Sequence, residues 1–405
     1  MSENIVEPVV ECMVDSCKIL VKCIGKVLGG NTHDFKLLFK EIGLQNKSEE
    51  YPELIRHKKL ENITTYLFKV PVGISLKDFE DKLEKIAFFI GEDTENLRLT
   101  RKGYSIELKI LTSKPKAVYD PGEYKMKKFK IPIGIELDTL KIRYWDLADP
   151  ANAHSYVAGT SRCGKSTLIR LIITQLIQRS IADVQLSLIN IKRVDLNEFK
   201  DCKNTRHYTE EEDEASEILL ENIKEMKRRY ILFNEHKGVK DIWRYREKVS
   251  KMPVRMIVIE EIAGFEKDNE FHTNLRLLAQ QGAGAGIFLL LATQLPNKDV
   301  LPNLTKQNIN TVFGGKCKDS IRSDIIIEDG ELNKLKGKGH MKVFDCDDYG
   351  TEIQVLWIDD DIVESIAQQN IKISLKKNKR AAVAGTTTTL GDNKNFEKPL
   401  LSPKL

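Results

Sequence analysis

The feature that most constrains this chain is the stretch from Gly159 to Thr167, with the sequence GTSRCGKST. It matches the pattern G-x-x-x-x-G-K-[ST] at every fixed position. Residues 154–158 before it are largely apolar, and residues 168–177 after it are apolar with polar side chains at helical spacing. This order predicts a buried strand, a glycine-rich loop and the start of a helix, which is the arrangement of a phosphate-binding loop.

The chemistry of such a loop follows from its geometry. Glycines let backbone N–H groups converge on phosphate oxygens, and the helix N-terminus adds positive potential. Lys165 is predicted to reach the β- and γ-phosphates of a nucleoside triphosphate, and the Ser166 hydroxyl is predicted to ligate Mg²⁺. The predicted nucleotide-binding residues are Gly159, Thr160, Ser161, Arg162, Cys163, Gly164, Lys165, Ser166 and Thr167.

The composition sets broad limits on the rest of the chain. Its 405 residues are enough for two or three domains with a sizeable core. The net charge of +4 permits nucleic-acid binding without arguing for it. Seven cysteines without a C-x-x-C pair indicate free thiols in a reducing compartment and no zinc module. The N-terminus has no basic segment of the kind that begins a signal peptide, so a cytoplasmic location is expected.

Residues 5–29 predict an amphipathic helix with one narrow polar stripe, acidic in its first half and basic in its second. Three roles are open for it: packing within the protein or against another subunit, lying on the inner face of the cell membrane, or spanning a bilayer. Six charges argue against the spanning role, because each is costly at the membrane centre. The charged residues are Glu7, Glu11, Asp15, Lys18, Lys22 and Lys26.

The chain divides into four predicted regions: the helix at 1–32, a small α+β domain at 33–135, a nucleotide-binding motor domain at 136–368 and a disordered basic tail at 369–405. In the small domain, residues 35–58 are expected to be mixed and helical. A strand is expected at Ile63–Pro71, an amphipathic helix capped by Ser75 at Leu76–Gly91, and strands at Leu97–Lys102 and Tyr104–Leu111. Residues 113–150 are expected to be extended and strand-like.

The motor domain is predicted to be an α/β fold with a mainly parallel sheet covered by helices on both faces. Its strands are fully apolar and alternate with helical patterns, while residues 201–213 are expected to form a loop. Expected strands are Val184–Ile191, Arg255–Ile259, Ile287–Ala292, Thr311–Phe313, Gly339–Phe344 and Thr351–Leu356, and expected helices are Glu214–Phe233 and Phe271–Gln281.

Two further motifs follow buried strands. Glu260 and Glu261 end the strand at 255–259; Glu260 is predicted to position Mg²⁺, and Glu261 to act as the general base on the attacking water. Most nucleotide motors place Asp at the first of these positions, and the longer Glu changes how it reaches the ion. Gln294, after the strand at 287–292, is predicted to sense the γ-phosphate or the water, because its amide both donates and accepts hydrogen bonds.

From about residue 140 to residue 358 the chain resembles the FtsK/SpoIIIE family of ATP-driven DNA translocases. Several motifs in the family's order carry this resemblance. Many members have Gly at the position of Arg162, and an arginine there resembles the conjugative-element branch of the family. The matching stretches are AGTSRCGKS at the phosphate loop, INIK at 189–192, EMKRRY at 225–230, MIVIEEIAGF at 256–265, GAGAGIFLLLATQLP at 282–296, IRSDII at 321–326 and KGKGHM at 336–341.

The resemblance implies a RecA-like P-loop fold and a homo-oligomeric ring, expected to be a hexamer, that threads double-stranded DNA and hydrolyses ATP at its subunit interfaces. In such rings a neighbouring subunit often supplies an arginine to the γ-phosphate, and Arg322 is the candidate for that catalytic role. Lys192 lies where the family has a lysine after the second strand. No winged-helix module is apparent after residue 366, so direction is expected to come from a partner, such as a relaxase or other transfer-complex protein, or from the end of the DNA that is loaded.

The function indicated is a DNA translocase serving transfer or segregation of a plasmid or other mobile element. The alternative is an ATPase of the same family in a protein secretion system, moving polypeptide. The single motor domain favours DNA, because secretion members usually join several motor domains on one chain. Candidate pore loops lie at 234–251 and 297–307, and their basic residues are Lys237, Lys240, Arg244, Arg246 and Lys298.

Overall fold

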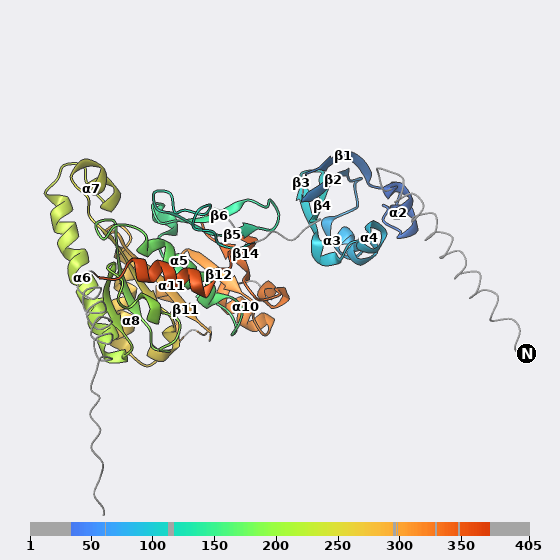
Figure 1. Cartoon of the computed structure of the whole chain (residues 1–405). Helices are drawn as coiled ribbons and strands as arrows, with labels where there is room; N and C mark the ends of the chain where they lie inside the picture. Colours follow the sequence, from blue (N-terminus) through green and yellow to red (C-terminus); the bar gives the residue numbers. More distant parts are fainter. Residues whose placement is uncertain are drawn as a thin grey trace, which may run out of the picture. The chain divides into compact units, whose positions relative to one another are not determined.

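The computed structural model describes residues 34–60, 62–111, 117–294, 297, 299–328, 330–346 and 349–372. The chain divides into two compact units, Met1–Lys116 and Ala117–Leu405 (Figure 1). The predicted helix at 5–29 lies outside the described residues, as do residues 373–405 of the predicted tail. No helix in the described part of the chain is long and apolar enough to cross a bilayer.

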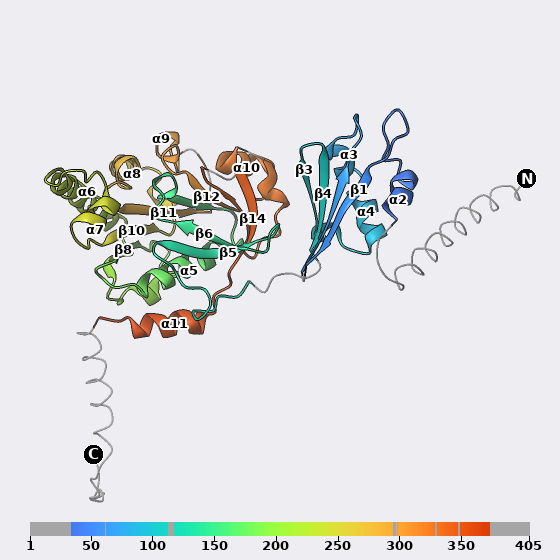
Figure 2. The same ribbon diagram turned by 90° about the horizontal axis from the view of Figure 1, so that it is seen from above.

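The first unit is an antiparallel sheet with its helices packed on one face (Figure 2). The strand order is β1-β2-β4-β3, and the core between sheet and helices is aromatic, with Phe35, Phe39, Phe68 and Phe79 buried. The elements are α2 (Phe35–Glu41), β1 (Glu53–Lys59), β2 (Ile63–Lys69), α3 (Leu76–Glu80), α4 (Leu83–Ile90), the 3₁₀ turn η1 (Thr94–Asn96), β3 (Leu97–Lys102) and β4 (Ser105–Leu111).

Two details of this unit differ from the sequence prediction. Residues 35–58 contain the strand β1 as well as a helix, because an edge strand exposed along almost its whole length has no apolar alternation to reveal it. The predicted single helix from Leu76 to Gly91 is two helices. Ser75 caps α3 through a capping box with Asp78, as expected, but a turn then separates α3 from α4.

The second unit is built on a sheet of ten strands in the order β6-β5-β14-β13-β12-β7-β11-β10-β8-β9. Pairs from β12 to β9 are parallel, and pairs from β6 to β12 are antiparallel, so the parallel part matches the predicted motor sheet. The strands are β5 (Lys130–Glu136), β6 (Ile142–Asp146), β7 (Ser155–Ala158), β8 (Val184–Ile189), β9 (Thr205–Thr209), β10 (Val254–Ile259), β11 (Ile287–Thr293), β12 (Thr311–Gly315), β13 (His340–Phe344) and β14 (Tyr349–Val355).

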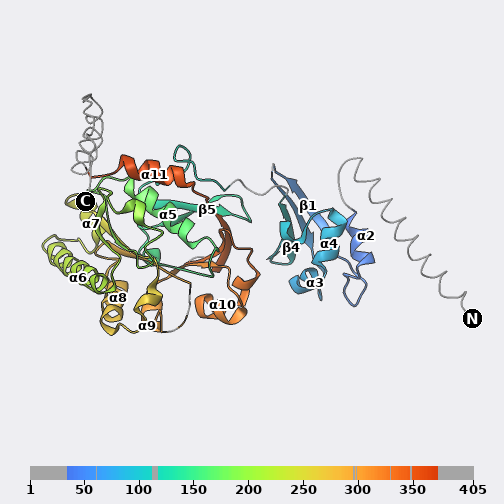
Figure 3. The same ribbon diagram turned by 60° about the horizontal axis from the view of Figure 1, so that its bottom comes forward.

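Helices cover both faces of this sheet. Along β10, Met256 and Val258 belong to one buried cluster and Ile257 and Ile259 to another, because alternate side chains point to opposite faces. Helices α5 and α11 lie together on one face, whereas α6 packs against α8 on the other (Figure 3). The helices are α5 (Lys165–Ile177), α6 (Glu212–Asn234), α7 (Ile242–Lys248), α8 (Asn269–Gln281), α9 (Asn303–Lys306), α10 (Ser320–Ile327) and α11 (Asp360–Gln369). Short 3₁₀ turns are η2 (Pro150–Asn152), η3 (Asn197–Phe199), η4 (Ile262–Phe265) and η5 (Gly330–Lys334).

The structure corrects three further expectations in this unit. The predicted loop at 201–213 contains β9, whose polar residues TRHYT suit the exposed edge of the sheet. The division between the units falls after Lys116 rather than at 135/136, because β5 hydrogen-bonds to β14 in the large sheet. Residues 369–372, expected to begin the tail, remain attached to the unit, since the Lys203 N–H donates to the Asn370 carbonyl over 2.8 Å.

The register of the parallel strands decides where the polar motifs meet. Ile259 of β10 pairs with both Ile189 of β8 and Leu291 of β11, and Thr293 of β11 pairs with Ala158 of β7. The carboxyl ends of these strands therefore reach the same edge of the sheet. The residues that follow them, including the phosphate loop after β7, meet at this edge.

Candidate active site

The loop between β7 and α5 has the backbone that its glycines predict. Gly159 and Gly164 adopt positive φ angles of 150° and 110°. At Gly164 a Cβ atom would lie 2.6 Å from the backbone nitrogen of Gly339, so no side chain fits there. The Gly339 N–H in turn donates to the Cys163 carbonyl over 2.8 Å. The start of β13 therefore holds the loop in place.

Lys165 begins α5 and points back into the loop. Its side chain is buried, and Nζ donates to the carbonyls of Gly159 over 2.6 Å and of Thr160 over 3.0 Å. Burial lowers the pKa of Lys165. Phosphate oxygens entering the loop would offer this ammonium stronger, charge-assisted partners than the two carbonyls it now holds.

Ser166 and Glu260, predicted to share a metal ion, lie on either side of a third residue, Asp195. The Ser166 hydroxyl donates to the Asp195 carboxylate. Glu260 is only 4% exposed, and burial together with the neighbouring Asp195 carboxyl raises the pKa of Glu260 to about 7. Asp195 was not predicted from the sequence: it lies in the segment after β8, which ends at Ile189, whereas Glu260 follows the last residue of β10 directly, so no strand-end pattern marks Asp195.

The donor set fits Mg²⁺. All of these groups are oxygen ligands, and Oε2 of Glu260 is buried without a hydrogen-bond partner. Within the described ranges no three His, Cys, Asp or Glu side chains form a metal site by themselves. Mg²⁺ is commonly held by one or two carboxylates with waters and substrate phosphates, so Ser166 and Glu260 would need the nucleotide to complete its coordination.

Glu261 is held by donors from two other strands. The Thr293 hydroxyl donates to Oε1 over 2.5 Å, and the Gln294 N–H lies 3.2 Å from Oε2. Nζ of Lys192 lies 2.7 Å from Oε2 of Glu261 and 3.9 Å from Oε1 of Glu260. Lys192, to which the sequence assigned no role, thus contacts both glutamates. Glu261 is thus a fixed carboxylate at the same edge of the sheet as the phosphate loop.

Gln294 and Arg322 have different surroundings. Gln294 lines the cavity beside the phosphate loop, as its predicted role requires. Arg322 lies in the first turn of α10, where its guanidinium pairs with Asp319 over 2.9 Å. It does not line that cavity, so the structure of one chain does not bring it to the phosphate loop. Leu295 and Pro296, the rest of the Gln294 motif, lie outside the described residues.

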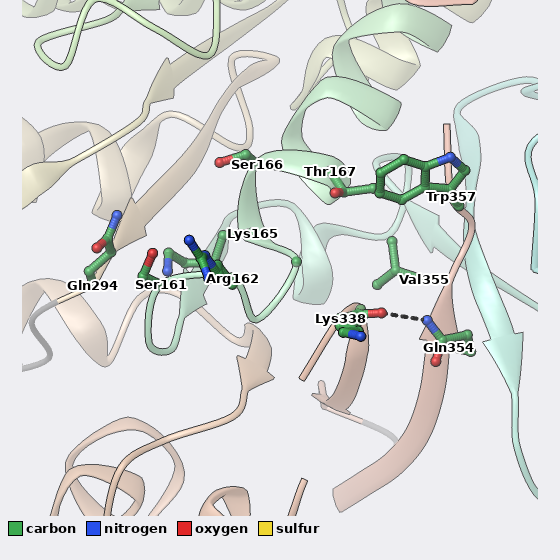
Figure 4. A pocket seen from close by; sticks show the side chains of 12 residues that line it. Ser161, Arg162, Lys165, Ser166, Thr167, Gln294, Lys338, Gln354, Val355 and Trp357 are labelled. Carbon is green, nitrogen blue, oxygen red and sulfur yellow. Dashed lines mark hydrogen bonds between the residues drawn. The ribbon is translucent and has the colours of Figure 1, made fainter. Parts of the chain in front are cut away.

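The cavity has a volume of about 420 Å³ and extends from the phosphate loop to the strands β13 and β14 (Figure 4). Its far end includes Trp357, which no sequence pattern singled out. The lining residues are Ser161, Arg162, Gly164, Lys165, Ser166, Thr167, Gln294, Lys338, Gly339, Gln354, Val355 and Trp357. A parallel sheet with a glycine loop, a lysine and two carboxylates at its carboxyl edge defines the second unit as a P-loop nucleoside triphosphatase fold.

Comparison with known proteins shows similarity to one family over part of the chain. Residues 116–265 match the FtsK/SpoIIIE family model. Among curated relatives, the DNA translocase FtsK of Lactococcus lactis is 28% identical over 256 residues, covering 59% of this chain and 33% of the relative. FtsK of Clostridium tetani is 34% identical over 198 residues, covering 46% of this chain and 26% of the relative. DNA translocase SftA of Bacillus subtilis is 31% identical over 198 residues, covering 46% and 21%.

The chain thus spans a third or less of the length of these relatives. Solved structures confirm the fold. The pCW3 conjugation coupling protein TcpA, solved with ATPγS, aligns with a TM-score of 0.58 at 19% identity, over 82% of this chain and 97% of that chain. The type VII secretion ATPase EccC of Thermomonospora curvata aligns with a TM-score of 0.54 at 16% identity, over 64% and 33%. The predicted resemblance to the FtsK/SpoIIIE family and the predicted α/β P-loop fold are confirmed.

Proposed function

We propose that this chain is an ATP-dependent translocase of double-stranded DNA. The observation that carries the proposal is the placement of Glu261 and Lys165 at one sheet edge, with the phosphate loop between β7 and α5 and the carboxylate held by Lys192 and Thr293. The sequence relatives named above are DNA translocases, which supports DNA as the substrate.

In the proposed reaction, the loop N–H groups and Lys165 bind the phosphates of ATP, while Ser166 and Glu260 hold Mg²⁺, which would neutralise charge on the transferring phosphoryl group. Glu261 accepts a proton from the attacking water, and Gln294 orients that water or the γ-phosphate. Nζ of Lys192 lies 2.7 Å from Oε2 of Glu261, so this ion pair would open when Glu261 contacts the attacking water.

A ring, proposed to be a hexamer, would place Arg322 of one subunit against the nucleotide of the next. The Arg322 side chain is 42% exposed, and its guanidinium pairs with Asp319, three residues away, an ion pair that would break when Arg322 contacts the nucleotide. DNA would then be held in the ring through its phosphates, which makes affinity steeply dependent on salt. Among the candidate pore residues, Lys237 and Lys240 are exposed, whereas Arg246 is committed to an ion pair with Asp183 at 2.6 Å. Lys298 lies outside the described residues.

The biological setting proposed is transfer or segregation of a plasmid or other mobile element, with a relaxase or other transfer-complex partner setting direction. The name of the structural neighbour TcpA, a conjugation coupling protein, supports this setting. A cytoplasmic location, with residues 5–29 on the inner face of the membrane, is part of the same proposal. The free cysteines Cys163, Cys202, Cys317 and Cys346 are consistent with a reducing compartment.

The second candidate is movement of a polypeptide, since the neighbour EccC belongs to a secretion system. Steady-state ATP turnover of the purified protein, with and without linear duplex DNA, separates the two. Stimulation by duplex that is lost in Glu261→Gln and declines with added salt is expected for the DNA translocase. Turnover that is indifferent to DNA at low salt would contradict DNA as the substrate and favour the polypeptide.

A further inference from the structure

Trp357 is the exposed aromatic residue at the end of the cavity that lies away from Gln294 (Figure 4). Its side chain is 55% exposed, while Trp145 is buried and Trp243 stacks on Phe288. Large aromatic surface left in water is costly, so a fully formed cavity that ends in an exposed indole is a place to look for a planar ligand.

The indole is carried on a fixed backbone. The Trp357 N–H donates to the Ala117 carbonyl over 2.6 Å, and its own carbonyl accepts from the Tyr119 N–H over 2.7 Å. No ring contact in the described part of the chain involves Trp357. The side chain is therefore carried on a backbone position that two hydrogen bonds fix beside the cavity.

The direction of a bound nucleotide follows from the order of the loop. In the proposed reaction Lys165 binds the β- and γ-phosphates, and the γ-phosphate lies toward Gln294, at one end of the cavity. Thr167, in the first turn of α5, lies beside Trp357 in Figure 4, at the opposite end of the cavity. A nucleotide with its terminal phosphate toward Gln294 has its base toward Trp357.

Apolar surface adjoins the indole, since Val355 is buried, and one side-chain N–H of Gln354 donates to the Lys338 carbonyl over 2.9 Å. The volume of about 420 Å³ lies within the range of small-molecule sites. Stacking tolerates any base with a large π-face, and purines offer the larger one.

We propose that Trp357 is the nucleobase platform of this site and grips the purine ring of the nucleotide by stacking. The inference rests on the proposed ATPase function and adds a subsite to it. Without edge contacts the platform favours purines over pyrimidines and separates ATP from GTP only weakly. Removing one base–aromatic stack typically costs about tenfold or more in affinity.

The test compares binding of a non-hydrolysable ATP analogue with binding of inorganic triphosphate, both with Mg²⁺, in the full chain. Trp357→Ala is expected to weaken binding of the analogue about tenfold while leaving the affinity for triphosphate unchanged. Trp357→Phe is expected to retain most of the affinity for the analogue. The matched control is Tyr144→Ala, which removes a side chain that is 42% exposed on β6 and does not line the cavity. This control is expected to leave the affinity for both ligands unchanged.

Equal affinity of Trp357→Ala and wild type for the analogue would overturn the platform while leaving the ATPase proposal intact. Parallel loss of triphosphate binding in that variant would also overturn it, because a purely structural defect does not distinguish the two ligands. Absence of binding of both ligands to the wild-type chain would instead remove the proposed function itself.

Discussion

The buried carboxyl of Glu260 makes the stability of the second unit depend on pH. Burial and the neighbouring Asp195 raise the pKa of Glu260 from 4.5 to about 7. Because the pKa is raised in the folded state, the native protein binds more protons than the unfolded chain between these values. The contribution of Glu260 to stability is therefore present below pH 4.5 and is lost as the pH rises through 7.

The size of this loss follows from the shift. A shift of about 2.5 pH units corresponds to about 3.4 kcal/mol at roughly 1.36 kcal/mol per unit. Between pH 5 and pH 8 the expected loss is about 2.5 kcal/mol, because part of the effect lies below pH 5. The side chain is 4% exposed, so solvent screening does not reduce this figure appreciably.

Glu260→Gln tests the reasoning, since an amide copies the protonated carboxyl at every pH. The tryptophans Trp145, Trp243 and Trp357 all lie in the second unit, so their fluorescence reports its unfolding in urea. The free energy of unfolding of the variant, relative to wild type, should rise by about 2.5 kcal/mol from pH 5 to pH 8. Glu247→Gln, on the exposed face of α7, should track wild type. A constant difference in the free energy of unfolding between Glu260→Gln and wild type across this range would refute the raised pKa of Glu260.

Three other outcomes are expected. Lys165→Ala should abolish nucleotide binding or turnover, whereas Glu261→Gln should bind ATP and lose about 10²- to 10⁴-fold in hydrolysis; near-normal rates in both would contradict the site. Gly315→Ala should destabilise the loop by about 1–3 kcal/mol in urea unfolding, because its Cβ would lie 2.6 Å from the Cys163 sulfur. Adding Cys163→Ala should restore most of that loss, and no recovery would rule out this clash as the cause. Mixing Arg322→Ala with Lys165→Ala subunits should recover turnover if the arginine acts across an interface, and turnover no higher than that of the separate variants would show that it does not.

Much of the site was accessible from local sequence because each part follows a short-range pattern. A glycine loop between a strand and a helix has one backbone solution, so residues 159–167 predicted both conformation and chemistry. Glu260, Glu261 and Gln294 were found because they follow fully apolar strands. Since β10 and β11 are buried along their whole length on both faces of the sheet, these strands were recognisable as continuous apolar runs.

The edges of the sheets escaped prediction for the opposite reason. β1 and β9 lie at sheet edges, carry largely polar side chains and are identified by their hydrogen-bonded partners, β2 and β8. Such strands have no apolar alternation of their own. The boundary between the units was misplaced for a related reason, because β5 joins the sheet through β14, which is far along the chain.

The sequence by itself determined the resemblance to the FtsK/SpoIIIE family, the phosphate loop and the identity of the residues that follow the central strands. Only the tertiary structure decided which of them touch: Asp195 accepts from Ser166, Lys192 contacts both glutamates, and Trp357 closes the far end of the cavity. Strand order and register bring these residues together from separate segments. Those are cooperative properties of the whole sheet, which no local window of the chain contains.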